Sequence, residues 1–443
     1  MKEFRVISQT GSAIVGPDIS EVRRVVQKHF PSLWPAVEAC LSTCATLLLK
    51  DNANPVTMIV MGPASSGKTT VTNMFAGAQF NDKPLCYRSD SFTAAAFVSH
   101  SAQLTKEQLE KIDLLPKIKD KVLVTPELAP IFRGDQDELV KRFSVLTRVL
   151  DGQGLKTDSG VHGDRGYEGD YVFAWIGATT PIEGQIWKVM AQLGSRLFFL
   201  LLDAGSFSSP KDILEDLVGS LHGEVPYTVK LQECKGVVGD YLTHLFARYG
   251  GPRQVEWDSS QNPIHVLEGI AQCAMLLAHM RTPYEPDSKP SHETAHRANT
   301  ILYNLARGRA LTYGRTQLNT DDVPMVAQVA LSSMPRDRRT IWMALARQEG
   351  RPLTVQQVAT VLEVSRHTAE DRMTEMEWLG CMVFDKPGNG KESTLRVRPE
   401  WTWFVTGQGA GLLLGTTWQN SGGESEAGTE SSITNPENEK EKR

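Results

Sequence analysis

A short glycine-rich stretch near the amino end constrains the fold of this chain more than any other feature. It follows an apolar run rich in β-branched residues at 56–61 and precedes a segment with helical periodicity. The stretch consists of Gly62, Pro63, Ala64, Ser65, Ser66, Gly67, Lys68 and Thr69. In this pattern, between a strand and a helix, backbone N–H groups turn inward around phosphate oxygens. The sequence therefore predicts an α/β fold with a phosphate-binding loop.

The side chains that end this stretch predict the ligands. The ammonium of Lys68 would reach the β- and γ-phosphates of a nucleotide, and the hydroxyl of Thr69 would bind Mg²⁺. Thr70 lies in the same first helical turn, where it contributes to the loop or serves only as a helix residue. We expect ATP and Mg²⁺ as ligands.

Further runs with strand character follow at 85–88, 121–125, 171–177 and 196–202, separated by helical segments. Such alternation is typical of a parallel sheet with helices on both faces. Two helices are expected before the first strand, within 21–50, where Pro31 and Pro35 interrupt the helical pattern.

Changes in composition and pattern divide the chain into five parts. Residues 203–334 are predominantly helical, with the firmest helices at 270–280 and 296–311, and 335–405 combine helices with two short strands at 381–385 and 394–397. From about 416 the chain is rich in Ser, Gly, Glu, Asn and Lys. We predict N-terminal helices (1–50), a P-loop core (51–204), a helical lid (205–334), a winged helix-turn-helix (335–410) and a disordered tail (411–443).

Hydrolysis of a bound nucleotide needs an acidic residue at the end of a neighbouring strand to orient the attacking water. Glu127, which follows the run 121–125, has this position. Pro126 stands where an aspartate on the metal side would be expected, so Thr125 or Asp90 would have to replace it. The other interpretation of Glu127 is a solvated carboxylate at a strand end.

The order of these motifs over 56–333 resembles the AAA+ ATPases, and within them the branch of the MoxR-type chaperones and the minichromosome maintenance helicases. Four segments carry this resemblance: a hairpin pattern at 160–167, a strand segment with a polar pair at 172–181, a Ser-Arg-Phe-like stretch at 193–198 and a basic helix at 296–310.

The resemblance implies roles for particular residues. His162 and Arg165 would form a basic hairpin tip in a ring pore, unless the segment is a plain surface hairpin, and Thr179 or Thr180 would help to hold the attacking water. Arg196 would be an arginine finger that reaches a neighbouring subunit, or else pairs with a local carboxylate. Arg297 would be the lid arginine that closes on the γ-phosphate. A homo-oligomeric ring, most often a hexamer, is then expected.

The segment 354–369 has the helix, turn and second helix of a DNA-reading unit, with Ser365 as the cap of the second helix. The side chains expected to contact DNA are Arg366, His367, Arg372, Lys386 and Lys391. Residues 335–400 contain 11 Lys and Arg against 10 Asp and Glu, a weak electrostatic signal for DNA. A protein-docking role for this unit therefore stays open.

The formal net charge of −5 argues against a polybasic nucleic-acid coat protein, so a DNA site would have to be local. The six cysteines form no C-x-x-C pair, and we expect reduced thiols that are mostly buried. No signal-peptide pattern and no membrane-length apolar run occurs, which favours a cytoplasmic protein.

Together these patterns predict an ATP-hydrolysing AAA+ motor that acts on DNA. The alternatives are a MoxR-like ATPase that remodels protein partners and an ATP-controlled DNA-binding regulator.

Overall fold

A five-stranded sheet lies at the centre of the amino-terminal two thirds of the chain. The computed structural model describes residues 16–99, 104–159, 163–192, 194, 196–202, 214, 218, 225–388 and 391–414. All five strands are parallel, in the order β4-β5-β8-β1-β9. Their bounds are β1 Val56–Met61, β4 Cys86–Arg88, β5 Val122–Thr125, β8 Ala174–Thr179 and β9 Phe199–Leu201. The five strands expected from the sequence, and their parallel arrangement, are confirmed.

The register of the sheet decides which side chains meet. β1 pairs with β8 from Val56 opposite Ala174 to Met61 opposite Thr179, and every residue of both strands is buried. Parallel strands are buried in this way because helices cover both faces of the sheet. The carboxyl ends of β1, β5 and β8 therefore lie along one edge, where the segments 62–67, 126–128 and 180–183 begin.

Two apolar cores form on the two faces of the sheet. Met58 and Val60 of β1 pack into the core on one face, and Ile59 and Met61 pack into the core on the other, because successive side chains of a strand point to opposite faces. The first core includes α1 Ile19–His29, α2 Trp34–Ala45, α9 Tyr227–Arg248, α10 Ile264–Arg281, α11 His296–Thr312 and α12 Val323–Ser332. The second includes α5 Leu114–Ile118, α6 Gln136–Val149 and α7 Gly184–Gln192, with α4 Lys106–Ile112 beside α5.

Helix α2 lies between the sheet and α11 and is almost entirely buried. Gly308 of α11 faces the backbone of Ser42, where an added Cβ would lie 2.1 Å from the carbonyl oxygen, so glycine allows this close approach. Pro35, expected to interrupt the helical pattern, instead lies in the first turn of α2, where its missing N–H costs no hydrogen bond. Cys40 and Cys44 pack in the core as free thiols.

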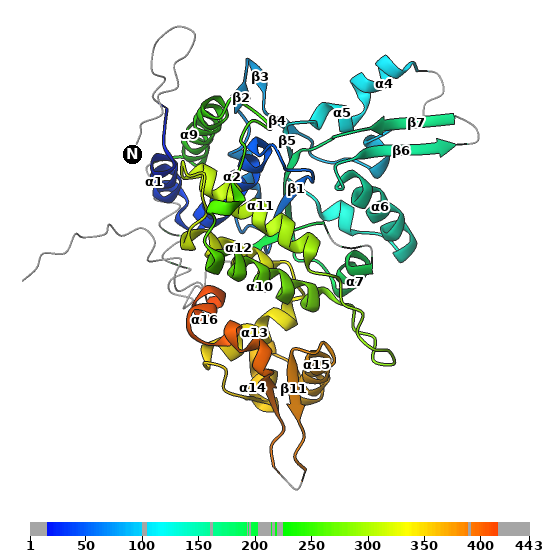
Figure 1. The fold of residues 1–443 in the computed structure, drawn as a ribbon, viewed down its shortest axis with the longest axis vertical. Helices are drawn as coiled ribbons and strands as arrows, with labels where there is room; N and C mark the ends of the chain where they lie inside the picture. Colours follow the sequence, from blue (N-terminus) through cyan, green and yellow to red (C-terminus); the bar gives the residue numbers. More distant parts are fainter. Residues whose placement is uncertain are drawn as a thin grey trace, which may run out of the picture.

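Two further units extend from this body (Figure 1). One is an antiparallel hairpin of β6 Gly154–Ser159 and β7 Gly163–Glu168. The other, called here the C-terminal unit (residues 336–414), has a three-stranded sheet in the order β10-β12-β11 with helices packed around it. Its elements are α13 Arg336–Arg347, β10 Leu353–Thr354, α14 Val355–Leu362, α15 Arg366–Trp378, β11 Met382–Asp385, β12 Thr394–Val397, the 3-10 helix Pro399–Val405 and α16 Gly407–Leu414.

Helix α16 extends further than the sequence indicates. The predicted tail begins at 411, but residues 411–414 belong to α16, where Leu412 and Leu414 pack against the core. Residues 415–443 lie outside the described residues. Of the helices that the structure describes, none is long and apolar enough to cross a bilayer.

Candidate nucleotide site at the carboxyl edge of the sheet

The segment 62–67, called here the glycine loop, connects β1 to α3 Lys68–Asn73. Its shape requires its two glycines. A Cβ on Gly62 would lie 2.6 Å from Ser66 Oγ, and Gly67 has a φ of 86°, in the left-handed region. Ser65 also has a positive φ, 62°. The loop therefore turns sharply and brings the chain into α3 at the edge of the sheet.

Lys68 folds back over the glycine loop. Its Nζ donates to the carbonyl oxygen of Pro63 and lies 3.5 Å from Ser66 Oγ. Burial lowers the pKa of Lys68, and the negative charge of Glu127 partly offsets this effect. Thr69 is exposed beside it, whereas Thr70 is buried and its hydroxyl lies 2.9 Å from the Tyr227 hydroxyl. Lys68 and Thr69 are thus both placed at the loop that we predict to hold phosphates.

Glu127 follows β5 on the same edge of the sheet. Its Oε1 accepts a hydrogen bond of 2.8 Å from the Ala129 N–H, and the residue is exposed. Pro126 is buried. Thr125, one of the two expected substitutes, is fully buried and accepts a 3.1 Å hydrogen bond from Trp175 Nε1.

The other expected substitute, Asp90, is exposed and pairs with Arg88 at 2.8 Å. The hydroxyl of Thr125 is thus engaged by Trp175, and the carboxylate of Asp90 is engaged by Arg88. The acidic group that acts electrostatically on Lys68 is Glu127.

Thr179, the last residue of β8, carries a buried hydroxyl with no hydrogen-bond partner among the described residues. Its carbonyl oxygen accepts the Gly62 N–H at 3.2 Å, which fixes it next to the glycine loop. An unpaired buried hydroxyl costs about 1–3 kcal/mol, so such groups usually have a ligand or a role.

Thr180 is half-buried and joins Thr179 in lining a cavity of about 250 Å³ between the end of β8 and the segment 129–134. Arg133, an exposed cation that the sequence analysis missed, lines the same cavity. The carbonyl oxygen of Arg133 accepts a 2.7 Å hydrogen bond from Arg142 of α6, which orders this segment. The two threonines differ in burial: Thr179 is 1% exposed and its hydroxyl is shut off from water, whereas Thr180 is half-buried.

Arg196 lies at the amino ends of the strands, which form the edge of the sheet opposite the glycine loop. Its carbonyl oxygen accepts a 3.0 Å hydrogen bond from Thr57 Oγ1, near the amino end of β1. Gly62 lies five residues after Thr57, a distance of about 17 Å at 3.3 Å per residue. The Arg196 side chain is 9% exposed, and its guanidinium forms a two-pronged ion pair with Asp151, at 2.9 and 3.3 Å. In the single chain, Arg196 is therefore paired with the local carboxylate of Asp151.

Arg297 lies with Arg196 rather than over its own glycine loop. Its guanidinium is 3.9 Å from Asp151 Oδ1 and near Gly194. Helix α11 starts at the amino edge of the sheet, so Arg297 lies away from the glycine loop of its own chain. Its expected contact with a γ-phosphate stays a prediction. Two arginines instead converge on one carboxylate there.

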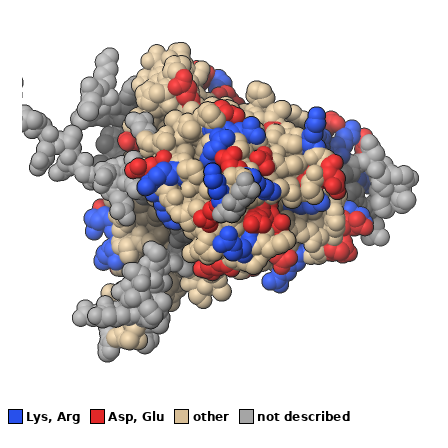
Figure 2. Space-filling model, turned by 90° about the horizontal axis from the view of Figure 1, so that it is seen from below, with Lys and Arg blue, Asp and Glu red and all other residues tan. Residues whose placement is uncertain are grey.

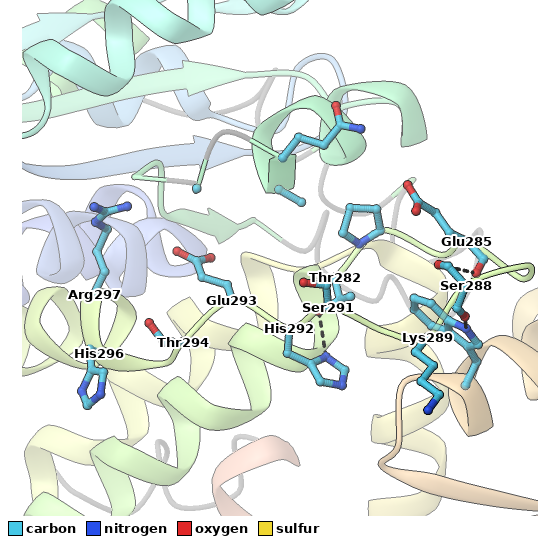
Figure 3. A pocket seen from close by; sticks show the side chains of 15 residues that line it. Thr282, Glu285, Ser288, Lys289, Ser291, His292, Glu293, Thr294, His296 and Arg297 are labelled. Atoms are coloured by element: carbon cyan, nitrogen blue, oxygen red, sulfur yellow. Dashed lines mark hydrogen bonds between the residues drawn. The ribbon is translucent and has the colours of Figure 1, made fainter.

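A cavity of about 680 Å³ adjoins Arg297, between the end of α7, the segment 282–296 and Trp378 of α15. Arg297 and Glu293 point to one side of this segment, and His292 and Lys289 point to the other (Figure 3). His292 lies 2.9 Å from the Thr282 hydroxyl, and burial lowers its pKa. No residue of the glycine loop lines this cavity.

The hairpin β6–β7 has the predicted form, but Arg165 does not lie at its tip. Arg165 pairs with Thr157, two residues from the end of the pairing, and its Nη1 donates to the Asp164 carbonyl at 3.2 Å. His162 lies outside the described residues. The structure thus places one of the two expected basic residues within a strand.

The expected DNA contacts of the C-terminal unit divide into two groups. Arg366 and His367, in the first turn of α15, are exposed, and Lys386 and Lys391 are exposed near the β11–β12 turn. Ser365 caps α15 by accepting the Thr368 N–H at 3.2 Å, as predicted.

Arg372, by contrast, forms ion pairs with Asp337 at 2.8 Å and Glu375 at 2.9 Å, so it joins α15 to α13. The view of this end of the molecule shows Lys and Arg interspersed with Asp and Glu rather than gathered in one basic patch (Figure 2). Trp378 is half-buried and donates a 2.8 Å hydrogen bond to the Ser288 carbonyl. It therefore links α15 to the segment 282–296.

No protein-family model matches this chain, and a search of curated proteins found no match either.

Besides Arg133, three residues that organise these sites were not predicted from the sequence. The carboxylate of Asp151 forms ion pairs with Arg196 and Arg297, and the hydroxyl of Tyr227 contacts that of Thr70. Arg281 is 5% exposed and donates to the carbonyl oxygens of Ser333 and Leu197, at 2.9 and 2.8 Å. Burial lowers the pKa of Arg281 to about 10. All three are joined to their partners by tertiary contacts that no local pattern signals.

Proposed function

We propose that this chain is an ATP hydrolase of the AAA+ type, which assembles into a ring, most simply a hexamer, and acts on DNA. One observation carries the proposal: the glycine loop, Lys68, Glu127 and the unpaired hydroxyl of Thr179 all lie at the carboxyl edge of one parallel sheet. In open α/β sheets ligands bind at this edge.

The residues at this edge match the requirements of phosphoryl transfer, in which positioning and charge stabilisation do most of the work. Inward N–H groups of the glycine loop and Lys68 would hold the β- and γ-phosphates in place of the loop carbonyl that Lys68 now contacts. Thr69 would bind Mg²⁺, which supplies charge neutralisation between the phosphates. Glu127 would orient the attacking water, and Thr179 would donate its unused hydroxyl to that water or to the γ-phosphate.

The arginine pair supports an active site shared between copies. Arg196 and Arg297 lie at the amino edge of the sheet, about 17 Å along the strand from the glycine loop of the same chain. A neighbouring copy in a ring would bring its own loop to this edge, where phosphates would replace Asp151 as the partner of the two guanidinium groups. Arg196 would then stabilise charge on the neighbour's nucleotide.

The C-terminal unit supports action on DNA through its architecture. Three helices and a three-stranded antiparallel sheet occur in the order expected for a winged helix. Arg366 and His367 at the start of α15, with Lys386 and Lys391 beside the β11–β12 turn, would contact phosphates or base edges. Arg372 is assigned instead to holding α15 against α13.

One observation favours a second function, the remodelling of protein partners. Acidic and basic side chains alternate over the end of the molecule that carries the C-terminal unit (Figure 2), and such a surface suits protein docking better than it suits a polyanion. The ATPase site would be the same in both functions. The substrate alone distinguishes them.

Mixing two inactive variants tests the shared site. Lys68→Ala should abolish turnover through loss of phosphate binding, and Arg196→Ala should abolish it through loss of charge stabilisation on the neighbour. A mixture of the two should recover part of the wild-type phosphate release, because some interfaces combine an intact loop with an intact arginine. Full activity of either variant, or a mixture no more active than its components, would contradict the proposal.

The same assay distinguishes the substrates. Phosphate release is measured from the wild-type chain alone, with single-stranded DNA and with duplex DNA. Stimulation by DNA, weakened in Arg366→Glu, supports the DNA motor. Stimulation by a protein client but not by DNA supports the second function.

A further inference from the structure

Two histidine rings pack against each other where the C-terminal unit meets α10. His279, in the last turn of α10, and His292, in the segment 282–296, have ring centroids 4.1 Å apart and ring planes inclined by 32°. His279 also lies edge to face against Trp401 of the C-terminal unit, with centroids 4.7 Å apart. The histidine pair therefore connects three parts of the chain.

The hydrogen bonds of the two rings decide which nitrogen carries the proton in the neutral imidazoles. His279 Nδ1 lies 3.0 Å from the Met275 carbonyl oxygen, which can only accept, so this nitrogen carries the proton. The hydroxyl of Thr282 donates to the Ala278 carbonyl at 3.1 Å and therefore accepts from His292 Nδ1 at 2.9 Å. In both rings a further proton would thus add at Nε2.

The segment 282–296 is also bound directly by the C-terminal unit. Arg338 of α13, which is 6% exposed, donates a 2.8 Å hydrogen bond to the Thr282 carbonyl. Trp378 of α15 donates to the Ser288 carbonyl, also at 2.8 Å. If the segment moves away from α10, these contacts no longer hold the C-terminal unit against the helix.

The charged side chains around the two rings come from several elements. In the segment 282–296, Lys289 lies on the same side as His292, whereas Glu293 points to the other side (Figure 3). The other titratable groups of these elements are Arg281 of α10, Glu285, His296 of α11, Arg338 paired with Glu375 at 2.7 Å, and Glu400 beside Trp401. Burial, and then the facing His279, lowers the pKa of His292. The surroundings of His292 thus favour its neutral form.

A proton has different consequences on the two rings. His279 lies in the last turn of α10, where the helix dipole favours a positive charge. Protonation of His292 as well would place two positive charges on rings with centroids 4.1 Å apart. In an opened junction His292 would titrate at its ordinary pKa of about 6.5, so the open form binds more protons than the closed form. The contact therefore stabilises the junction fully above about pH 6.5 and loses this effect as the pH falls further.

We propose that His279 and His292 form a pH-sensitive contact, which holds the segment 282–296 on α10 while His292 is neutral and loses its hold when both rings are protonated. Because Arg338 and Trp378 bind the same segment, acidification also loosens the attachment of the C-terminal unit. The inference does not depend on the proposed hydrolysis of ATP.

Thermal unfolding of the full chain at pH 7.5 and pH 5.5 tests the inference. Between these pH values the unfolding midpoint of the wild type should fall by about 2–4 °C more than that of His292→Gln, the order expected for one weakened contact in a unit of 150–250 residues. Glutamine keeps an N–H donor for Thr282 and cannot be protonated in this range. The comparison therefore isolates the titration of His292 from acid effects elsewhere in the chain.

His265→Gln is the matched control, because His265 is an exposed histidine of the same helix. This variant should keep the full fall of the wild-type midpoint. A pH titration of the histidine carbon resonances by NMR examines the pair itself. The His292 resonance, identified by its absence in His292→Gln, should titrate below about pH 6.5, and its midpoint should rise in His279→Gln, which lacks the facing ring.

Three outcomes would overturn the inference. The first is an unfolding midpoint that falls equally in the wild type and in His292→Gln. The second is a His292 resonance that titrates at or above about pH 6.5 in the wild type. The third is a titration of His292 that His279→Gln leaves unchanged, because the two rings would then not interact.

Discussion

Replacing Thr179 by valine should stabilise the protein and slow it at the same time. Valine has nearly the same shape and the same branching at Cβ, so the change removes the hydroxyl without opening a cavity. The hydroxyl of Thr179 is buried, 1% of the residue being exposed, and has no partner among the described residues. Removing an unsatisfied buried hydroxyl should recover about 1–3 kcal/mol.

The expected shift of the unfolding midpoint is upward by about 2–4 °C for each kcal/mol, the value for a unit of 150–250 residues. Turnover should fall about 10- to 150-fold, because a hydrogen bond to a charged group contributes about 1.5–3 kcal/mol. The assays are thermal unfolding without nucleotide and steady-state phosphate release with saturating ATP and Mg²⁺.

Thr57→Val is the matched control. Thr57 lies on the neighbouring strand β1 and is equally buried, but its hydroxyl donates to the Arg196 carbonyl and accepts the Phe198 N–H, both at 3.0 Å. Its loss should destabilise the fold by about 1–3 kcal/mol, because the Phe198 N–H loses its partner. If Thr179→Val also destabilises the fold, or leaves turnover unchanged, the hydroxyl is structural and the reasoning is refuted.

Three more predictions follow from the described contacts. Glu127→Gln should retain ATP binding and lower the rate of phosphate release by about 100-fold or more, the usual effect of losing the group that activates water. Turnover equal to that of the wild type would mean that Glu127 is only a solvated carboxylate at a strand end. Arg366→Ala should lower the affinity for DNA and the salt dependence of that affinity, as DNA titrations at two salt concentrations would show. Arg372→Ala should lower the unfolding midpoint in thermal unfolding and leave DNA binding nearly unchanged. The six cysteines should react slowly with a thiol reagent at pH 8 until the chain is unfolded, since burial raises their pKa values, that of Cys86 to about 12; rapid labelling of the native chain would contradict this.

The sheet could be predicted because its sequence signals are local. The strand β1 consists of six consecutive buried residues, and a run of this kind between loop and helix signals indicates a strand covered on both faces. The alternation of such runs with helical segments predicted the parallel arrangement, and Gly67 adopts the left-handed backbone that the glycine pattern requires.

The partners of the arginines could not be predicted, because they depend on tertiary distance. Arg196 pairs with Asp151, 45 residues earlier in the chain, and Arg372 pairs with Asp337, 35 residues earlier. An arginine that matches a motif has the same local sequence whether it faces a neighbour or a carboxylate of its own chain. Only the placement of α11 revealed that Arg297 lies with Arg196.

The contact between Thr70 and Tyr227 joins residues 157 positions apart. Tyr227 begins α9, and nothing in its neighbourhood resembles a nucleotide motif. A contact between residues so far apart in the chain leaves no local pattern in the sequence.

A calorimetric titration of ATP with Mg²⁺ into the wild-type chain and into Lys68→Ala tests the central claim most directly. The account predicts saturable binding of about one ATP per chain for the wild type, and loss of that binding in the variant because the ammonium that holds the phosphates is gone. A wild-type chain that takes up no ATP, or a variant that binds it with unchanged affinity, would contradict the assignment of the glycine loop and every role derived from it.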